Sequence, residues 1–140
     1  MNAPSHPCIF CEIIAGSAES SEIYRGDSCI AFLDLSPINP GHALVCPTRH
    51  ISSFLDVEPG ELSEMLSVAQ RVSRSQLAKL PGCSGVNLLL SEGESAGQEV
   101  PHVHLHVVPR AEGDEFGWRR FGSSSSREEL DAIAAQLHCS

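Results

Sequence analysis

Apolar side chains recur at helical spacing in two parts of the chain. After Pro59, a residue suited to a first helical turn, apolar positions continue three or four residues apart until Leu80-Pro81-Gly82 ends the run. Near the C-terminus, Ser126 and Glu129 have the spacing of a capping box, and an apolar stripe follows them. We therefore expect an amphipathic helix of about five turns after Pro59 and a shorter helix after Ser126. The apolar positions are Leu62, Met65, Leu66, Ala69 and Val72 in the first helix, and Leu130, Ile133, Ala134 and Leu137 in the second.

Five short apolar runs, each bounded by turn residues, are typical of strands. Gly26-Asp27 suits a tight hairpin between the first two runs, and residues 37–41 suit an exposed loop before the third. The pattern predicts an α+β fold, in which an antiparallel sheet of about five strands has its two main helices on one side. The predicted strands span residues 23–25, 29–33, 42–47, 85–90 and 103–108.

Length and charge narrow the picture further. A chain of 140 residues with no internal repeat or linker fits one core, so we expect residues 1–140 to form a single domain. Eighteen acidic against nine basic residues give a formal net charge of −9, which argues against nucleic acid or an anionic membrane as a partner. We recognise neither an export signal nor a membrane span and expect a cytoplasmic protein, whose six cysteines are thiols or metal ligands.

The most informative run is His102-Val103-His104-Leu105-His106. In a strand, alternate side chains face opposite sides, so the three imidazoles would line one surface, about 6.6 Å apart. A solvated strand face and a histidine-rich metal tract are two simpler interpretations. Strict alternation favours a functional surface, because neutral imidazole is both a nucleophile and a metal ligand near pH 7.

These residues resemble the signature of the histidine-triad (HIT) family of nucleotide hydrolases and transferases. The sequences Pro40-Gly41-His42 and Ala96-Gly97-Gln98-Glu99-Val100-Pro101 resemble the strand and the loop that precede that signature. The likeness covers roughly residues 8–121, in the expected order and spacing. It implies a HIT-like fold.

The resemblance assigns roles to five residues. It makes His104 the nucleophile that attacks the α-phosphorus of a nucleotide, and His106 a hydrogen-bonding group near that phosphate. It makes His42 the support of His106, and Gln98 a contact to the phosphate and the leaving-group oxygen. The backbone around Gly97 would supply further donors. This scheme requires no metal ion for catalysis.

The resemblance also suggests how a nucleoside would be held. Asp34 matches the position that contacts the ribose hydroxyls, and Phe10, Phe32 and Leu33 would form an apolar slot for the base. Ordinary core positions remain an alternative for Phe10 and Phe32, and a turn role remains one for Asp34.

Two positions depart from the family pattern near the nucleotide. Ser91 stands where many members have an amide, and Glu99 stands where eukaryotic members often have a hydroxyl. A carboxylate at position 99 would repel phosphate unless it turned outward, so both residues bear on substrate preference. The resemblance implies that the tail around Trp118 helps to form the nucleotide pocket, and capping of the sheet by this aromatic side chain remains an alternative.

A Cys-x-x-Cys pair, Cys8 and Cys11, precedes the first predicted strand. Alone it would be compatible with a free or redox-active pair. In a subset of the family, however, such a pair combines with a histidine after the Pro-Gly-His strand and with the first triad histidine. His50 and His102 match these positions and would complete a closed structural zinc site.

The resemblance therefore implies a homodimeric, zinc-containing nucleotide hydrolase. It would act at the α-phosphate of a nucleoside phosphoramidate, an adenosine polyphosphate or a dinucleoside polyphosphate, through a nucleotidyl-histidine intermediate. The partner would be a purine nucleotide or a related phosphate compound. A nucleotidyl transferase or phosphorylase, and a nucleotide-binding regulatory module with incidental turnover, remain open as alternatives.

Overall fold

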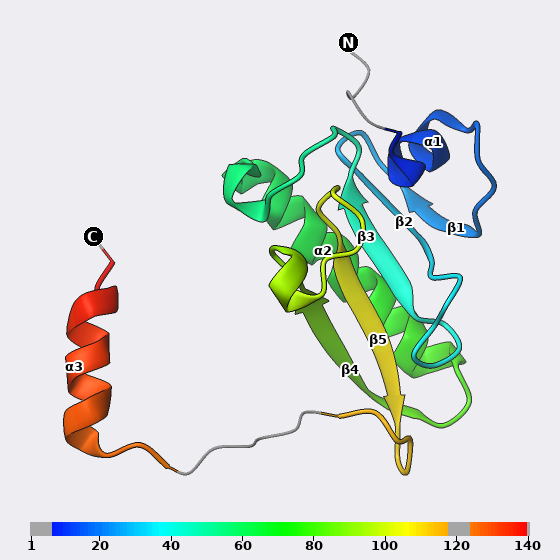
Figure 1. The fold of residues 1–140 in the computed structure, drawn as a ribbon. Coiled ribbons are helices and arrows are strands. Elements are labelled where there is room, and N and C mark those ends of the chain that lie inside the picture. The colour runs from blue at the N-terminus through cyan, green and yellow to red at the C-terminus, as the bar shows by residue number, and fades with distance from the viewer. Residues whose placement is uncertain (1–6, 118–123, 140) are drawn as a thin grey trace.

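The protein folds around one antiparallel sheet of five strands in the order β1-β2-β3-β5-β4 (Figure 1). A computed structural model describes residues 7–117 and 124–139. The strands are β1 (Glu22–Arg25), β2 (Cys29–Leu33), β3 (Ala43–Pro47), β4 (Cys83–Leu90) and β5 (Leu105–Ala111). The three α-helices are α1 (Ile9–Ala15), α2 (Pro59–Lys79) and α3 (Arg127–Leu137), and two short 3-10 helices are η1 (Phe54–Asp56) and η2 (Glu94–Ala96). The α+β fold class predicted from the sequence is confirmed.

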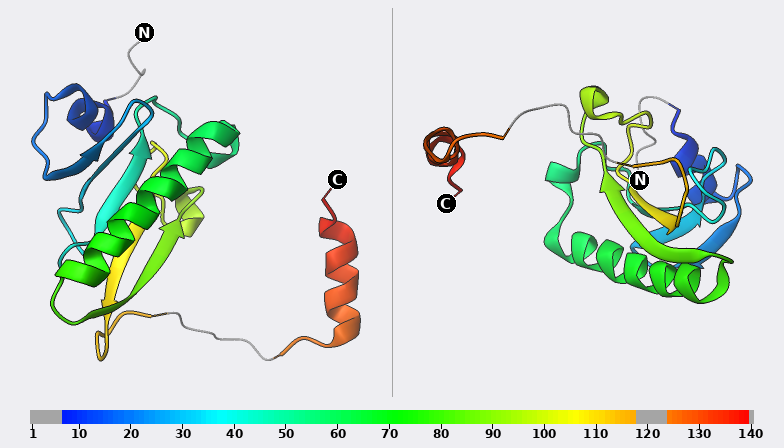
Figure 2. Two further views of the ribbon diagram at one scale, coloured as in Figure 1. Left: turned by 180° about the vertical axis from the view of Figure 1, so that it is seen from behind. Right: turned by 90° about the horizontal axis from the view of Figure 1, so that it is seen from below.

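Helix α2 covers one face of the sheet (Figure 2). Its apolar stripe, which includes Met65, Val68 and Val72, is buried against alternate residues of the strands. Two of these strand residues are Val45 and Val107, both fully buried. The helical periodicity after Pro59 predicted the helix and most of its buried side, but Leu66 of the predicted stripe is exposed and Val68 is buried in its place.

Helix α1 lies on the opposite face and was not predicted. Phe10 and Ile13 pack there against Phe32 and Leu44, which alternate with the residues facing α2. The sequence interpretation placed helices on one side of the sheet only, and α1 adds a helix on the other side. With only seven residues, α1 is too short for periodicity to reveal it. Its end does carry a signal, because Gly16 adopts a left-handed conformation (φ 82°) that closes the helix.

The last predicted strand begins two residues later than expected. Before β5, the amide of Val103 donates to the carbonyl oxygen of Ile51, and that of His102 donates to Val100. The chain from His102 to His104 therefore leads into β5 from a bend and is not part of the ladder. The predicted alternation still holds, since Val103 is buried on the α2 side.

Helix α3 begins at the predicted capping box, in which Ser126 and Glu129 each accept the other's backbone amide. None of its residues is buried. No helix in the described ranges is both long and apolar enough to cross a membrane.

Candidate active site

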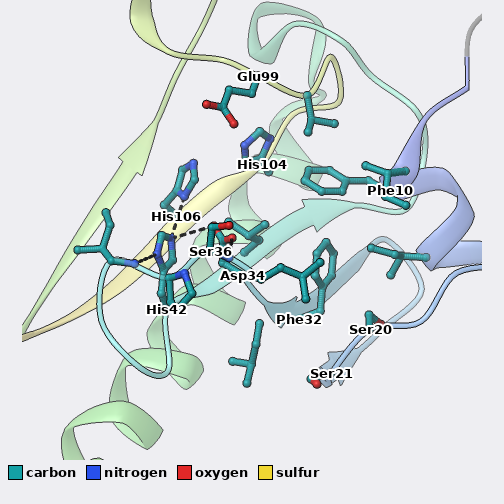
Figure 3. A pocket seen from close by; sticks show the side chains of 18 of the residues that line it. Phe10, Ser20, Ser21, Phe32, Asp34, Ser36, His42, Glu99, His104 and His106 are labelled. Atoms are coloured by element: carbon teal, nitrogen blue, oxygen red, sulfur yellow. Dashed lines mark hydrogen bonds and ion pairs between the residues drawn. The ribbon is translucent and has the colours of Figure 1, made fainter.

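A cavity of about 700 Å³ opens on the side of the sheet opposite α2 (Figure 3). This volume lies in the usual range for small-molecule sites. Its lining includes apolar side chains from α1 and the sheet, and three imidazoles from the start of β3 and the approach to β5. These residues are Phe10, Phe32 and Leu44 on the apolar side, and His42, His104 and His106 on the polar side.

His104 is held in one tautomer by the backbone of His102. Its Nδ1 lies 2.8 Å from the carbonyl oxygen of His102, which only accepts hydrogen bonds, so Nδ1 carries the proton. The Nε2 atom of the neutral ring therefore keeps its lone pair. The ring of Phe10 packs edge-on against His104, with 5.0 Å between ring centroids, which fixes the orientation of the imidazole. This geometry suits a nucleophilic nitrogen.

A chain of hydrogen bonds, which we call the relay, runs from the amide of Ile38 through His42 to His106. The amide of Ile38 donates to His42 Nδ1 over 3.0 Å, so the proton of the neutral ring is on Nε2. That Nε2 lies 2.9 Å from His106 Nδ1 and donates to it, which leaves the proton of His106 on its own Nε2. His106 thus offers a hydrogen-bond donor beside the nucleophile.

Burial keeps these rings neutral. It lowers the pKa of His42, although the carboxylate of Asp34 opposes the shift. Burial also lowers the pKa of His106 to about 4, with smaller contributions from His104 and His42. Near pH 7 the relay therefore operates between uncharged imidazoles.

Asp34 lies at the edge of this relay. Its Oδ1 accepts the amide of Ser36 over 2.8 Å, and its Oδ2 is 3.6 Å from His42 Nε2. Asp34, His42 and His106 are close enough to share a metal ion. Both nitrogens of His42 are already engaged, however, so binding a metal there would break the relay. The arrangement favours hydrogen bonding.

A second cluster contains the first triad histidine, His102, together with Cys8, Cys11 and His50. Their ligand atoms all lie within 4.8 Å of one another. Cys11 Sγ is 3.2 Å from His50 Nδ1 and 3.6 Å from His102 Nδ1, and Cys8 Sγ is 3.5 Å from His102 Nδ1. Tetrahedral ligands at the usual zinc bond lengths lie roughly 3.3–3.8 Å apart. The four side chains therefore fit a closed metal site.

The protons around this cluster also suit a metal. His102 Nε2 donates to the carbonyl oxygen of Pro47 over 2.9 Å, which directs the lone pair on Nδ1 toward the thiols. Burial lowers the pKa of His102 to about 4, and a neutral ring is the form that binds metal. Burial, together with the neighbouring Cys8, raises the pKa of the Cys11 thiol to about 11. A cation is the group that would stabilise two thiolates here.

Comparison with known proteins gives a consistent result. The family model described as "HIT domain" matches residues 15–113. The chain belongs to the HIT family. This is a family of nucleotide-binding hydrolases and transferases. An uncharacterized HIT-like protein of Mycobacterium tuberculosis is 41% identical over 111 residues, which cover 79% of this chain and 76% of that protein.

Two other relatives bear on the site. Adenylylsulfatase HINT3 of Arabidopsis thaliana is 33% identical over 130 residues, covering 93% of this chain and 65% of the plant protein. A zinc-bound histidine-triad protein of Mycobacterium smegmatis has a solved structure that is 37% identical. It superposes with a TM-score of 0.75 and covers 93% of this chain and 94% of the other.

In this HIT protein the loop before the triad is fastened by Gln98. Its Oε1 accepts the amide of Gly93 over 2.9 Å, and its Nε2 donates to the carbonyl oxygens of Ser52 (3.0 Å) and Val100 (3.2 Å). In this conformation Gln98 clasps two loops together, and it is not part of the described cavity lining. Gly97 does line the cavity, but its amide donates within the loop to Glu94.

The other sequence-predicted residues are distributed around the cavity. Asp34 and Leu33 line it, as do Phe10 and Phe32. Ser91 follows the end of β4 and is absent from the described lining. Glu99 belongs to the lining, and Trp118 lies outside the described residues.

One buried residue behind the site was missed. Gln76 of α2 is 5% exposed, and its Nε2 donates to the carbonyl oxygens of Gly41 (2.9 Å) and Val107 (3.0 Å). These carbonyls adjoin His42 and His106 in the chain, so one amide fixes the backbone behind both rings. A glutamine within the apolar stripe of a helix was the available signal. Gly41 itself needs its positive φ of 95° to turn the chain into β3.

Proposed function

We propose that this HIT protein hydrolyses nucleotides at the α-phosphate through a covalent nucleotidyl-histidine on His104. The observation that carries the proposal is the hydrogen bond from His104 Nδ1 to the carbonyl oxygen of His102, which leaves a lone pair on Nε2 in a nucleotide-sized cavity. The substrates would be purine nucleoside phosphoramidates, adenosine polyphosphates or dinucleoside polyphosphates. The name of the relative adenylylsulfatase HINT3 supports an adenylyl group in particular.

In the first step, His104 Nε2 attacks the α-phosphorus. A bond forms between His104 Nε2 and phosphorus while the bond from phosphorus to the leaving group breaks. The electron pair departs with the leaving group, and an amine leaving group takes up one proton from solvent. The ring gains positive charge as it bonds to phosphorus, and the carbonyl oxygen of His102 stabilises that charge through the Nδ1 proton. His106 donates its Nε2 proton as a hydrogen bond to a phosphate oxygen, with His42 fixing its tautomer.

In the second step, water attacks the same phosphorus and the P–N bond breaks. A nucleoside monophosphate leaves carrying the hydroxyl of that water, the other water proton passes to solvent, and His104 returns to its neutral form. The nucleophile is a ring nitrogen in the first step and water in the second, and hydrogen bonds hold the phosphate in both, so this scheme requires no metal ion.

Asp34 would accept hydrogen bonds from the ribose hydroxyls, since its carboxylate reaches the cavity beside the relay. The apolar wall made by Phe10, Phe32 and Leu33 would receive the base. Gln98 contributes through the loop that it fastens, and a direct contact from its side chain to phosphate would require the clasp to open.

The proposal includes a structural zinc ion held by Cys8, Cys11, His50 and His102. The ligand spacing and tautomers support it, as does the zinc-bound relative from Mycobacterium smegmatis. A bound zinc ion would crosslink the N-terminal segment to the approach to β5. Because α1 also carries Phe10, which packs on His104, this crosslink would help to orient the nucleophile.

We extend the proposal to a homodimer in the cytoplasm. Exposed apolar side chains on α2, β4 and α3 support self-association, among them Leu66, Leu88 and Ile133. Light scattering on the purified protein tests the assembly, and a monomer at micromolar concentration would contradict it. Reduced thiols at the zinc site suit a cytoplasmic location.

Intact-protein mass spectrometry tests the chemistry. The protein is mixed with adenosine 5′-phosphoramidate, adenylyl sulfate or diadenosine polyphosphate and quenched in alkali, because the P–N bond is acid-labile. We expect an adenylyl adduct and AMP with the wild type and with His138→Asn, a matched change at an exposed histidine. His104→Asn should give neither. Turnover by the His104 variant at the wild-type rate would refute the nucleophile, and transfer to an added acceptor instead of water would indicate a transferase.

A further inference from the structure

The charged side chains in the described lining of the cavity that we assign to nucleotides are acidic. Glu19, Asp34 and Glu99 contribute carboxylates, and no Lys or Arg occurs among the described lining residues. These carboxylates repel the phosphate of any nucleotide that enters the cavity. Any further charge on the substrate should therefore affect how well it is accepted.

Two of these carboxylates, Asp34 and Glu99, occupy different parts of the cavity. Asp34 lies beside His42, at the end assigned to the ribose. Figure 3 shows Glu99 next to His104, on the side of that ring away from Asp34. If the ribose of a nucleotide binds at Asp34 and its α-phosphate lies at His104, the leaving group on the α-phosphorus would extend toward Glu99.

Glu99 lies in a loop that hydrogen bonds fix, whereas its carboxylate has no partner among the described residues. It follows Gln98, whose clasp fixes the loop to Gly93 and Ser52. Within the described residues, Glu99 has neither a hydrogen bond from its side chain nor an ion pair, and it is exposed to the cavity mouth. Its charge is therefore available to a ligand.

We infer that Glu99 sets the specificity for the leaving group, favouring groups with a cationic amine and disfavouring anionic ones such as polyphosphate or sulfate. The inference rests on the proposed function and deepens it. The preferred substrate class is a nucleoside monophosphate joined to a group that bears an ammonium ion. Two unit charges about 6 Å apart in a water-rich site alter binding roughly three- to tenfold.

Three adenosine 5′-phosphoramidates vary the charge on the leaving group while a P–N bond breaks in each. Because the leaving amines also differ in basicity, the effect of Glu99 is measured as the change in their kcat/KM ratio between the wild type and the Glu99 variants. The leaving amines are ethylenediamine, n-propylamine and glycine, which carry a pendant ammonium, methyl and carboxylate group of similar size. We expect kcat/KM of the wild type to fall in that order. The ratio between the first and the third substrate should narrow as salt is raised, since ions screen an exposed charge.

Glu99→Gln should reduce the ratio of ethylenediamine to glycine substrate at least about tenfold, and Glu99→Lys should invert the order. Glu94→Gln is the matched control, because it removes one carboxylate from the same loop outside the cavity lining, and it should keep the wild-type ratio. Equal ratios in the wild type and Glu99→Gln would overturn the inference and leave the proposed hydrolase intact. Cleavage of diadenosine polyphosphate or adenylyl sulfate but of none of these three substrates would also overturn the inference, whereas no cleavage of any of these compounds would refute the proposed function itself.

Discussion

His42 Nε2 lies 2.9 Å from His106 Nδ1, and this single contact fixes the protons of two rings. It has this effect because the amide of Ile38 occupies the other nitrogen of His42. The order of donors runs from a loop amide through His42 to His106 and ends in the cavity. A backbone group in one loop thus determines which atom of the triad is offered to a substrate.

Removing His42 should weaken catalysis without abolishing it. In His42→Phe, His106 loses the donor that holds its tautomer, and part of its population would present a lone pair to the phosphate. We expect kcat to fall about 10- to 100-fold, as is usual for a supporting residue, with the adduct on His104 still detectable. Steady-state kinetics measures the loss, and ¹⁵N chemical shifts of His106 report the tautomer. An unchanged tautomer with reduced kcat would contradict the relay.

The relay predicts a loss of stability in mild acid. Burial lowers the pKa of His106 from its ordinary 6.5 to about 4. Between these values the unfolded chain binds more protons than the folded one, so the free energy of unfolding falls as the pH drops from about 6.5 to about 4. Above pH 6.5 this contribution is fully present.

Urea unfolding between pH 4 and pH 7 measures this dependence. His106→Asn retains an acceptor for His42 but does not titrate, so its pH dependence should be shallower than that of the wild type. Parallel curves for the two proteins would show that His106 is not the group responsible.

One zinc ion per chain is expected after purification without chelator. Cys11→Ser should lower both the metal content and the melting temperature, because a hydroxyl is a poor zinc ligand and the crosslink of the N-terminal segment is lost. Cys139→Ser, at an exposed position, is the control and should leave both unchanged. Elemental analysis and thermal denaturation provide the measurements. Metal-free protein of undiminished stability would instead suggest a disulfide between Cys8 and Cys11.

Gln76 should contribute to stability well beyond an ordinary helix glutamine. Gln76→Met keeps the volume but leaves the carbonyl oxygens of Gly41 and Val107 without their donor. Such unpaired buried groups cost about 1–3 kcal/mol of unfolding free energy. Gln70→Met, on the exposed side of α2, should change little. Urea unfolding measures the free energy of unfolding of both variants, and an equal decrease in the two would contradict a special role for Gln76.

Much of this arrangement follows from local sequence patterns. The alternation of His102, His104 and His106 with valine and leucine correctly separated a core side from a polar side. The capping box at Ser126 correctly located the start of α3. Both signals depend on residues close together in the chain, so they remain valid without knowledge of the tertiary fold.

The proton positions could not be predicted in the same way. They depend on backbone groups brought from distant segments, such as the amide of Ile38 for His42 and the carbonyl oxygen of Pro47 for His102. Almost every residue has a backbone amide and a carbonyl group, so the sequence does not indicate which of them will contact a given histidine. Helix α1 was missed for a related reason, because its burial against Phe32 depends on tertiary packing rather than on its own short pattern.

Asp34 provides the last prediction, which concerns how an acidic protein retains a nucleotide. If its carboxylate accepts the ribose hydroxyls, Asp34→Ala should weaken AMP binding about 10- to 100-fold while changing the affinity for 2′,3′-dideoxy-AMP far less, because the latter lacks the diol. Titration calorimetry measures both ligands. Raising salt should leave AMP affinity constant or slightly higher, since screening reduces the repulsion from the net charge of −9. Equal weakening of both ligands would place Asp34 in the support of His42 instead, and a steep loss with salt would indicate that arginines hold the phosphate.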